Sequence, residues 1–140
     1  MQTIPTTELK SADSKLRAEA AVKVLLEKKG LSVKLFDVRD ISSVTDFYIN
    51  ATGRSSTQVK SLADDVVHSL SLKGADALRV EGREGNAWLL VDYGDVIVNV
   101  FDKPSRDFYN LDRHFPEQSS VDISYLVAEV DAKLQINSDK

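Results

Sequence analysis

The strongest constraint on the fold is a pair of apolar runs, AWLLV and VIVNVF, on either side of the four residues DYGD at 92–95. Two runs of strand length joined by a short connection that contains glycine are typical of a β-hairpin. A two-residue turn at Tyr93-Gly94 would place Asp92 directly opposite Asp95. The sequence therefore predicts a hairpin with two carboxylates facing each other at its tip.

Because side chains alternate between the two faces of a strand, this hairpin has two different faces. One face is purely aliphatic and is expected in the core: Ala87, Leu89, Val91, Val96, Val98 and Val100. The other carries the two aspartates together with Trp88, Leu90, Ile97, Asn99 and Phe101. Like charges placed opposite each other cost up to about 1 kcal/mol, so we expect a cation, an arginine or a bound partner at the tip. A tryptophan beside leucine and isoleucine with a charged rim is either ordinary core or the centre of an interface.

Two helices are expected before this hairpin. The first begins at Asp13 or Ser14 and ends at the sequence KKG of 28–30, with cations and a glycine where helix C-termini prefer them. Its buried face is expected to carry Leu16, Ala20, Val24 and Leu25. The second follows the capping-box pair Ser55 and Gln58 and has the clearest helical period of the chain. That period comprises Val59, Leu62, Ala63, Val66, Val67 and Leu70, and leaves His68 on the solvent side.

Further strands are predicted at 33–38, 45–51 and 77–82, and a short helical segment from Pro104 to Pro116. A last helix has one apolar stripe: Ile123, Leu126, Val127, Val130 and Leu134. This order of elements predicts an α/β (mixed α+β) fold, with a single mixed β-sheet of about five strands and helices packed on it. We expect a mobile N-terminal arm over 1–12, one domain over 13–136 and a frayed tail over 137–140.

Composition excludes several classes of function. The chain has no cysteine and only two histidines, so thiolate chemistry is excluded and a histidine metal cage is not expected. No segment has the roughly 20 apolar residues that span a bilayer, and a cytoplasmic protein is expected. The net charge is -4, and residues 76–113 contain eight acids and five bases. This balance argues against a partner held mainly through phosphates.

An enzymatic interpretation starts from Asp92 and Asp95 as magnesium ligands in a nucleotidyltransferase-like site. The segment Gly53-Arg54-Ser55-Ser56 at a helix start resembles the anion-binding element of such sites. However, the sequence contains no Asp-x-Asp, no P-loop and no Ser/His/Asp set at motif spacing. The residues therefore support an enzyme poorly.

Taken together, four blocks resemble the Iojap or ribosomal silencing factor (RsfS) family. They are SSVTDFYINATGRSSTQVK at 42–60, VEG at 80–82 followed by Trp88, VDYGDVIVNVF at 91–101 and RDFYNLD at 106–112. The resemblance implies a factor without enzymatic activity or cofactor, on a fold similar to nucleotidyltransferases but without their catalytic aspartates. It implies binding to ribosomal protein L-fourteen on the large ribosomal subunit. Occupying that face would sterically block joining of the small subunit and lower translation when nutrients are scarce.

By position, the resemblance places the partner-binding surface on one set of residues: Trp88, Asp92, Tyr93, Gly94, Asp95, Arg106, Tyr109 and Leu111. The family often has histidine at the position of Asn99 and Leu-Trp at His114-Phe115, which leaves the outer edge of this surface undefined. The acidic balance suits a basic ribosomal protein. The alternatives are the magnesium-dependent enzyme and an adaptor for another basic protein. The aromatic patch also allows a homodimer of the unbound protein.

Overall fold

The computed structural model describes residues 5–11, 13–83 and 85–138, with the side chains of 83 and 136–138 excepted. It contains one mixed sheet of six strands in the order β3-β4-β5-β2-β1-β6. The strands are β1 (Leu31–Asp37), β2 (Phe47–Gly53), β3 (Arg79–Arg83), β4 (Trp88–Asp92), β5 (Val96–Asp102) and β6 (Ser120–Val121). The predicted class, a single mixed sheet with helices packed on it, is confirmed.

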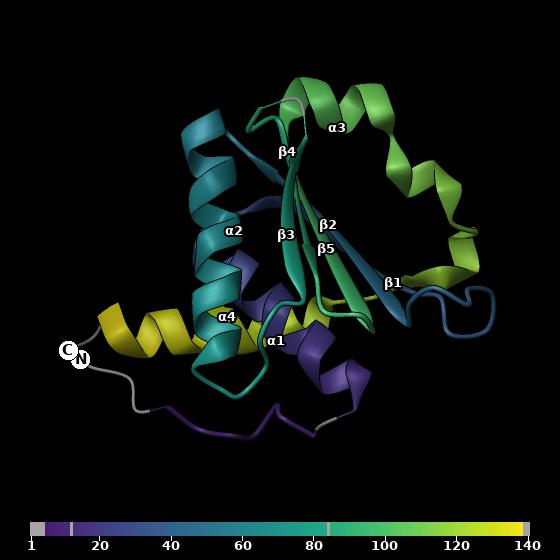
Figure 1. Cartoon of the computed structure of the whole chain (residues 1–140). Coiled ribbons are helices and arrows are strands. Elements are labelled where there is room, and N and C mark those ends of the chain that lie inside the picture. The colour runs from purple at the N-terminus through teal and green to yellow at the C-terminus, as the bar shows by residue number, and fades with distance from the viewer. Residues whose placement is uncertain (1–4, 12, 84, 139–140) are drawn as a thin grey trace.

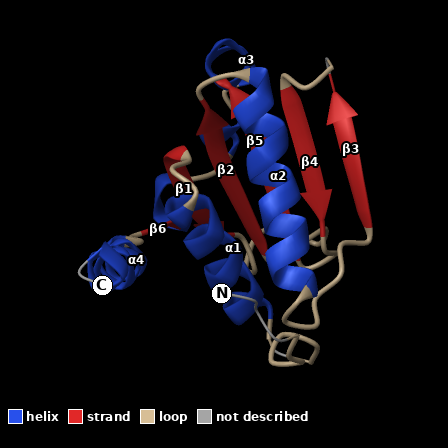
Figure 2. Cartoon of the chain, turned by 90° about the vertical axis from the view of Figure 1, so that its left-hand side faces the viewer, coloured by secondary structure: helices blue, strands red, loops and turns tan. Residues whose placement is uncertain are grey.

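The helices form unequal layers on the two faces of the sheet (Figures 1 and 2). α1 (Ser14–Glu27) and α2 (Ser56–Ser71) cover one face, and α4 (Ser124–Ser138) packs against α1. The short helix α3 (Lys103–Tyr109) and the 3-10 turns η1 (Leu111–His114) and η2 (Glu117–Ser119) cross the other face. We call these the helix face and the α3 face.

The centre of the sheet is the parallel pair β2–β5, whereas the other strand pairs are antiparallel. Parallel neighbours need a crossover, and here α2 and the β3–β4 ribbon supply it. Alternate residues of β2 and β5 point to the helix face and are fully buried there: Phe47, Ile49, Ala51, Val96, Val98 and Val100.

α1 begins where the sequence predicts it. Asp13 is the N-cap, and its carboxylate accepts a hydrogen bond from the Leu16 backbone N–H at 3.2 Å. The prediction that Leu16 is buried is wrong, since that side chain is 51% exposed. The other three predicted residues, Ala20, Val24 and Leu25, are buried. Ala18, Ala21 and Val22 join them, because α1 packs between the sheet, α2 and α4 and so buries a wider face than one apolar row. The left-handed residue after the helix is Lys29 (φ 68°) rather than Gly30.

The predicted pair Ser55 and Gln58 caps the start of α2, with the return bond reaching the residue before the N-cap. Ser55 Oγ accepts from the Gln58 N–H at 3.1 Å, and the Gln58 side chain accepts from the Arg54 N–H. Gly53 precedes this start because a Cβ there would lie 2.8 Å from the Val59 nitrogen. His68 is exposed, as expected.

The hairpin has the predicted faces but a different turn. Asp92 pairs with Ile97 and Trp88 with Phe101, so the turn residues are Gly94-Asp95 and not Tyr93-Gly94. The Tyr93 N–H donates to the Val96 carbonyl at 2.9 Å and closes this turn. Moving the turn by one residue moves the cross-strand pairing by two, which preserves the faces. The two aspartates are consequently not opposite each other.

Part of the predicted N-terminal arm, 1–4 and 12, lies outside the described residues. In 5–11, Leu9 is buried in the core, and its N–H donates to the Lys73 carbonyl at 2.8 Å. Mobility of the arm remains a prediction. α4 continues to Ser138, two residues past the predicted domain end, and the tail residues 139–140 lie outside the described residues.

Candidate functional site

The tip of the hairpin is held by arginines. Gly94 adopts φ 88°, a conformation that favours glycine, and its N–H donates to Asp92 Oδ1 at 2.7 Å. The other oxygen of Asp92 accepts from Arg79 Nε at 3.1 Å. Burial raises the pKa of the Tyr48 phenol, and the negative charge of Asp92 raises it further.

Asp95 has an arginine of its own. Its Oδ2 forms an ion pair with Arg17 Nη1 of α1, and its backbone carbonyl accepts from the N–H groups of Asp46 (3.0 Å) and Phe47 (3.2 Å). Two arginines, Arg79 and Arg17, thus supply the compensating positive charge that was expected at the tip. The two ion pairs fasten the tip to β3 and α1, and each arginine offsets the charge of its carboxylate.

Tyr93 does not lie at the surface. It points to the helix face, is 8% exposed and belongs to the main apolar core. Burial raises the pKa of its phenol far above the ordinary value. Tyr93 therefore offers little surface to a partner, although the sequence places it in the contact set.

Trp88 is buried on the α3 face. Its ring lies 5.1 Å from Phe101 and 4.8 Å from Tyr109, measured between ring centroids, and it is 8% exposed. Its indole Nε1 donates to Asn99 Oδ1 at 3.0 Å. Tyr109 and the 80% exposed Phe108, in edge contact with it at 5.0 Å, form the outer surface above the tryptophan.

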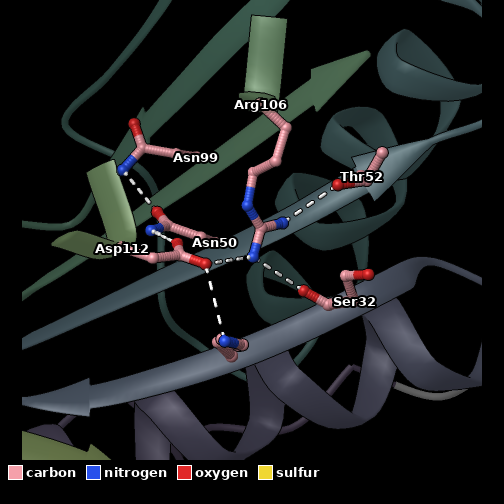
Figure 3. A network of polar contacts seen from close by, with 7 residues as sticks. Ser32, Asn50, Thr52, Asn99, Arg106 and Asp112 are labelled. Atoms are coloured by element: carbon pink, nitrogen blue, oxygen red, sulfur yellow. Dashed lines mark hydrogen bonds and ion pairs between the residues drawn. The ribbon is translucent and has the colours of Figure 1, made fainter. Parts of the chain in front are cut away.

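A polar network continues from the Asn99 side chain, and Figure 3 shows it from Asn99 onward. Asn99 Nδ2 donates to Asn50 Oδ1 at 3.2 Å, and Asn50 Nδ2 donates to Asp112 Oδ1 at 2.7 Å. Asp112 Oδ2 then accepts from Arg106 Nη2 at 2.9 Å and lies 3.8 Å from Lys34 Nζ.

Arg106 is the centre of this network and is buried. Besides Asp112, its guanidinium donates to Thr52 Oγ1 and to the Ser32 carbonyl, both at 3.0 Å. Since α3 contributes Arg106 and η1 contributes Asp112, the network fastens this whole segment to β1, β2 and β5 (Figure 3). Sequence reasoning missed Asn50 and Asp112. The available signal was an asparagine inside each of the two apolar strand runs, YINAT and VIVNV.

The predicted contact residues thus fall into two groups. Asp92, Gly94 and Asp95 form the tip, while Trp88, Arg106, Tyr109 and Leu111 lie around α3. Asp92 and Trp88 are four strand residues apart, about 13 Å. Sequence reasoning also missed two apolar side chains that border these groups, Leu78 (73% exposed) beside Gly94, and Phe108.

Among the described residues, no three acidic or histidine side chains are grouped so that they could hold a metal ion. Within the same residues, no helix is both long and apolar enough to cross a membrane.

The chain is similar in sequence and in fold to known proteins of one family. The profile of the family described as "Ribosomal silencing factor during starvation" (RsfS) matches residues 11–140. A ribosomal silencing factor RsfS of Halalkalibacterium halodurans is 31% identical over 110 residues, which cover 79% of this chain and 94% of that protein. The chloroplastic protein Iojap of Arabidopsis thaliana is 28% identical over 122 residues, 86% of this chain and 51% of that protein. A crystal structure of a protein from Chromobacterium violaceum superposes with a TM-score of 0.70 at 34% identity, covering 73% of this chain and 85% of that one.

Proposed function

Because the chain belongs to the ribosomal silencing factor family, we propose that it binds the large ribosomal subunit through ribosomal protein L-fourteen and blocks joining of the small subunit. The match over residues 11–140 carries this proposal. The protein then acts by steric exclusion in the cytoplasm, without catalysis or cofactor, and lowers translation during starvation.

The charge of the hairpin region supports a basic partner. Residues 76–113 have a surplus of three acids, eight against five bases. Asp92 and Asp95 already pair with Arg79 and Arg17, yet both carboxylates remain partly accessible. An acidic rim of this kind steers a basic protein and fixes its orientation more than it adds raw affinity.

The contact residues have two different roles in this proposal. Asp92, Gly94, Asp95, Tyr109 and Leu111 offer surface to the partner, and Phe108 adds an exposed aromatic anchor of the type found at hot spots. The buried residues Trp88, Tyr93 and Arg106 shape that surface from beneath.

The charge at the tip can be tested with a matched pair of variants. Asp92→Asn with Asp95→Asn removes two charges at the tip, and Asp64→Asn with Asp65→Asn removes two from the outer face of α2. We expect the tip variant to bind isolated large subunits roughly tenfold more weakly in co-sedimentation, and the α2 variant to bind as the unmodified protein does.

The aromatic surface is tested separately with Phe108→Ala and Tyr109→Ala, using Tyr125→Ala as the exposed aromatic control on α4. Loss of L-fourteen binding only in the α3 variants supports the proposal. Unchanged binding of both the tip and the α3 variants, at unchanged Tm, would refute the assigned surface. Analytical ultracentrifugation of the same variants tests whether this aromatic patch also forms a homodimer.

A further inference from the structure

The helix layer carries a pocket that the proposed function does not use. It has a volume of about 380 Å³ and lies where α1, the end of α2 and α4 meet. Its floor is aliphatic, with Ala20, Val24, Leu72 and Val130. Four lysines from these three elements also line it: Lys23, Lys28, Lys73 and Lys133.

Two of these lysines are neutralised by reciprocal ion pairs between α1 and α4. Lys23 Nζ lies 3.6 Å from Glu129, and Lys133 Nζ lies 3.0 Å from Glu27. Each pair takes one base and one acid from the lining of the pocket. They fasten α4 to α1 and add no net charge.

Lys28 and Lys73 are the remaining cations. Within the described part of the chain, neither ammonium group makes an ion pair or a hydrogen bond. Four lysines and two glutamates leave the lining at +2, whereas the whole chain is at -4. Positive charge is thus gathered at one pocket of an acidic protein.

Helix dipoles explain why Lys28 and Lys73 each lie at a helix end, but they do not explain why both lysines line the same pocket. Lys28 caps the C-terminus of α1 and Lys73 follows the end of α2, where cations are favoured. These two helix ends belong to separate elements, and the fold brings both lysines to one concave site. Two unpaired ammonium groups there suit an anion with two negative charges spread over several oxygens.

We propose that this pocket binds phosphate groups, either of an RNA backbone or of a free polyphosphate. Lys28 and Lys73 supply the surplus charge, and the two ion pairs hold the walls. The RNA source rests on the proposed function, because a protein bound to the large subunit lies beside ribosomal RNA. The net charge of -4 argues against a partner held mainly through phosphates, whereas this pocket would add only about two phosphate contacts to a complex held mainly by protein.

The test is thermal unfolding of the full chain in inorganic tripolyphosphate at low salt. At about ten times its Kd, tripolyphosphate should raise Tm by roughly 4 °C, because it binds the native state alone. Lys28→Gln with Lys73→Gln should abolish the rise. The matched control, Lys60→Gln with Lys103→Gln, removes the same charge outside the pocket and should keep it. No rise in the unmodified protein, or an equal rise in both variants, would overturn the proposal.

Oligouridine and guanosine triphosphate, used in the same assay, identify the source of the phosphate. If RNA is the source, the dependence of large-subunit affinity on salt should weaken by about two phosphate contacts in the Lys28 and Lys73 variant. Binding of that variant to isolated L-fourteen should be unchanged. A protein that shifts with tripolyphosphate but does not bind L-fourteen would refute the proposed function and leave the phosphate site standing.

Discussion

Toward α1 and α2 the central strands present alanine, valine, isoleucine and phenylalanine. Toward α3 they mix two asparagines and a threonine with apolar side chains: Trp88, Leu90, Ile97 and Phe101. Both faces are buried. Apolar contacts on the helix face have no direction, so many side-chain sets of equal volume would fill it. The hydrogen bonds of the α3 face need each donor opposite its acceptor, and they tie Arg106 and Asp112 to fixed places on the strands. We therefore expect the apolar helix face to supply most of the stability, and the α3 face to decide where the proposed docking surface lies.

The largest effect is expected on the helix face. Leu62→Ala removes a fully buried side chain of α2 and leaves a cavity, so the free energy of unfolding should fall by about 3 kcal/mol. Urea denaturation measures it, with the half-buried Val67→Ala as a milder comparison on the same helix. If Leu62→Ala lowers the free energy of unfolding less than Arg106→Ala does, the helix face is not the main source of stability.

The next effect concerns the network. Arg106→Ala leaves Asp112 with Asn50 and a distant Lys34, and should lower the free energy of unfolding by about 2 kcal/mol. Lys103→Ala breaks an exposed ion pair on the same helix and should cost less than about 0.5 kcal/mol. Hydrogen exchange should accelerate throughout 103–114 in Arg106→Ala alone. Uniform acceleration across the sheet would mean that the network does not act on this segment.

A smaller effect should follow the indole hydrogen bond. Trp88→Phe keeps a ring between Phe101 and Tyr109 but leaves Asn99 Oδ1 without its donor, which should cost about 1 kcal/mol. Tyr109→Phe is the control, since its hydroxyl makes no hydrogen bond within the described residues. Equal stability of both variants in urea would show that the network ends at Asn99.

The smallest effect concerns α4. Burial and a hydrogen bond to Glu19 raise the pKa of Tyr125 to about 12. The unfolded phenol ionises near pH 10, so the contribution of Tyr125 is complete below that pH and is lost as pH rises toward 12. Because this side chain is about half exposed, the loss should stay under about 0.5 kcal/mol. Tyr125→Phe should flatten the stability profile between these pH values, and an unchanged profile would exclude the tyrosine as its cause.

The pattern of the sequence predicted the parts of the molecule that depend on local rules. Asp13 and Ser55 cap α1 and α2 as expected, because a short oxygen side chain meets free N–H groups at a helix start. The prediction that Leu16 is buried was wrong because burial depends on which elements surround α1, and periodicity alone does not carry that information.

The candidate site was predicted in part for the same reason. The acidic tip and its need for arginines follow from charge and strand pairing, and Arg17 and Arg79 are present there. Tyr93 turned inward because the turn moved to Gly94-Asp95, a choice set by the positive φ that glycine allows.

By itself, the sequence determined the alternation that separates an aliphatic face from a mixed one, and the four motif blocks that identify the family. Both properties are carried by residue order along the chain. The tertiary structure alone decided that Asn50, Asn99, Arg106 and Asp112 meet, and that Lys28 and Lys73 share a pocket. These groups come from elements up to 62 residues apart, as in the bond from Asn50 to Asp112, and only the packing of strands and helices brings them together.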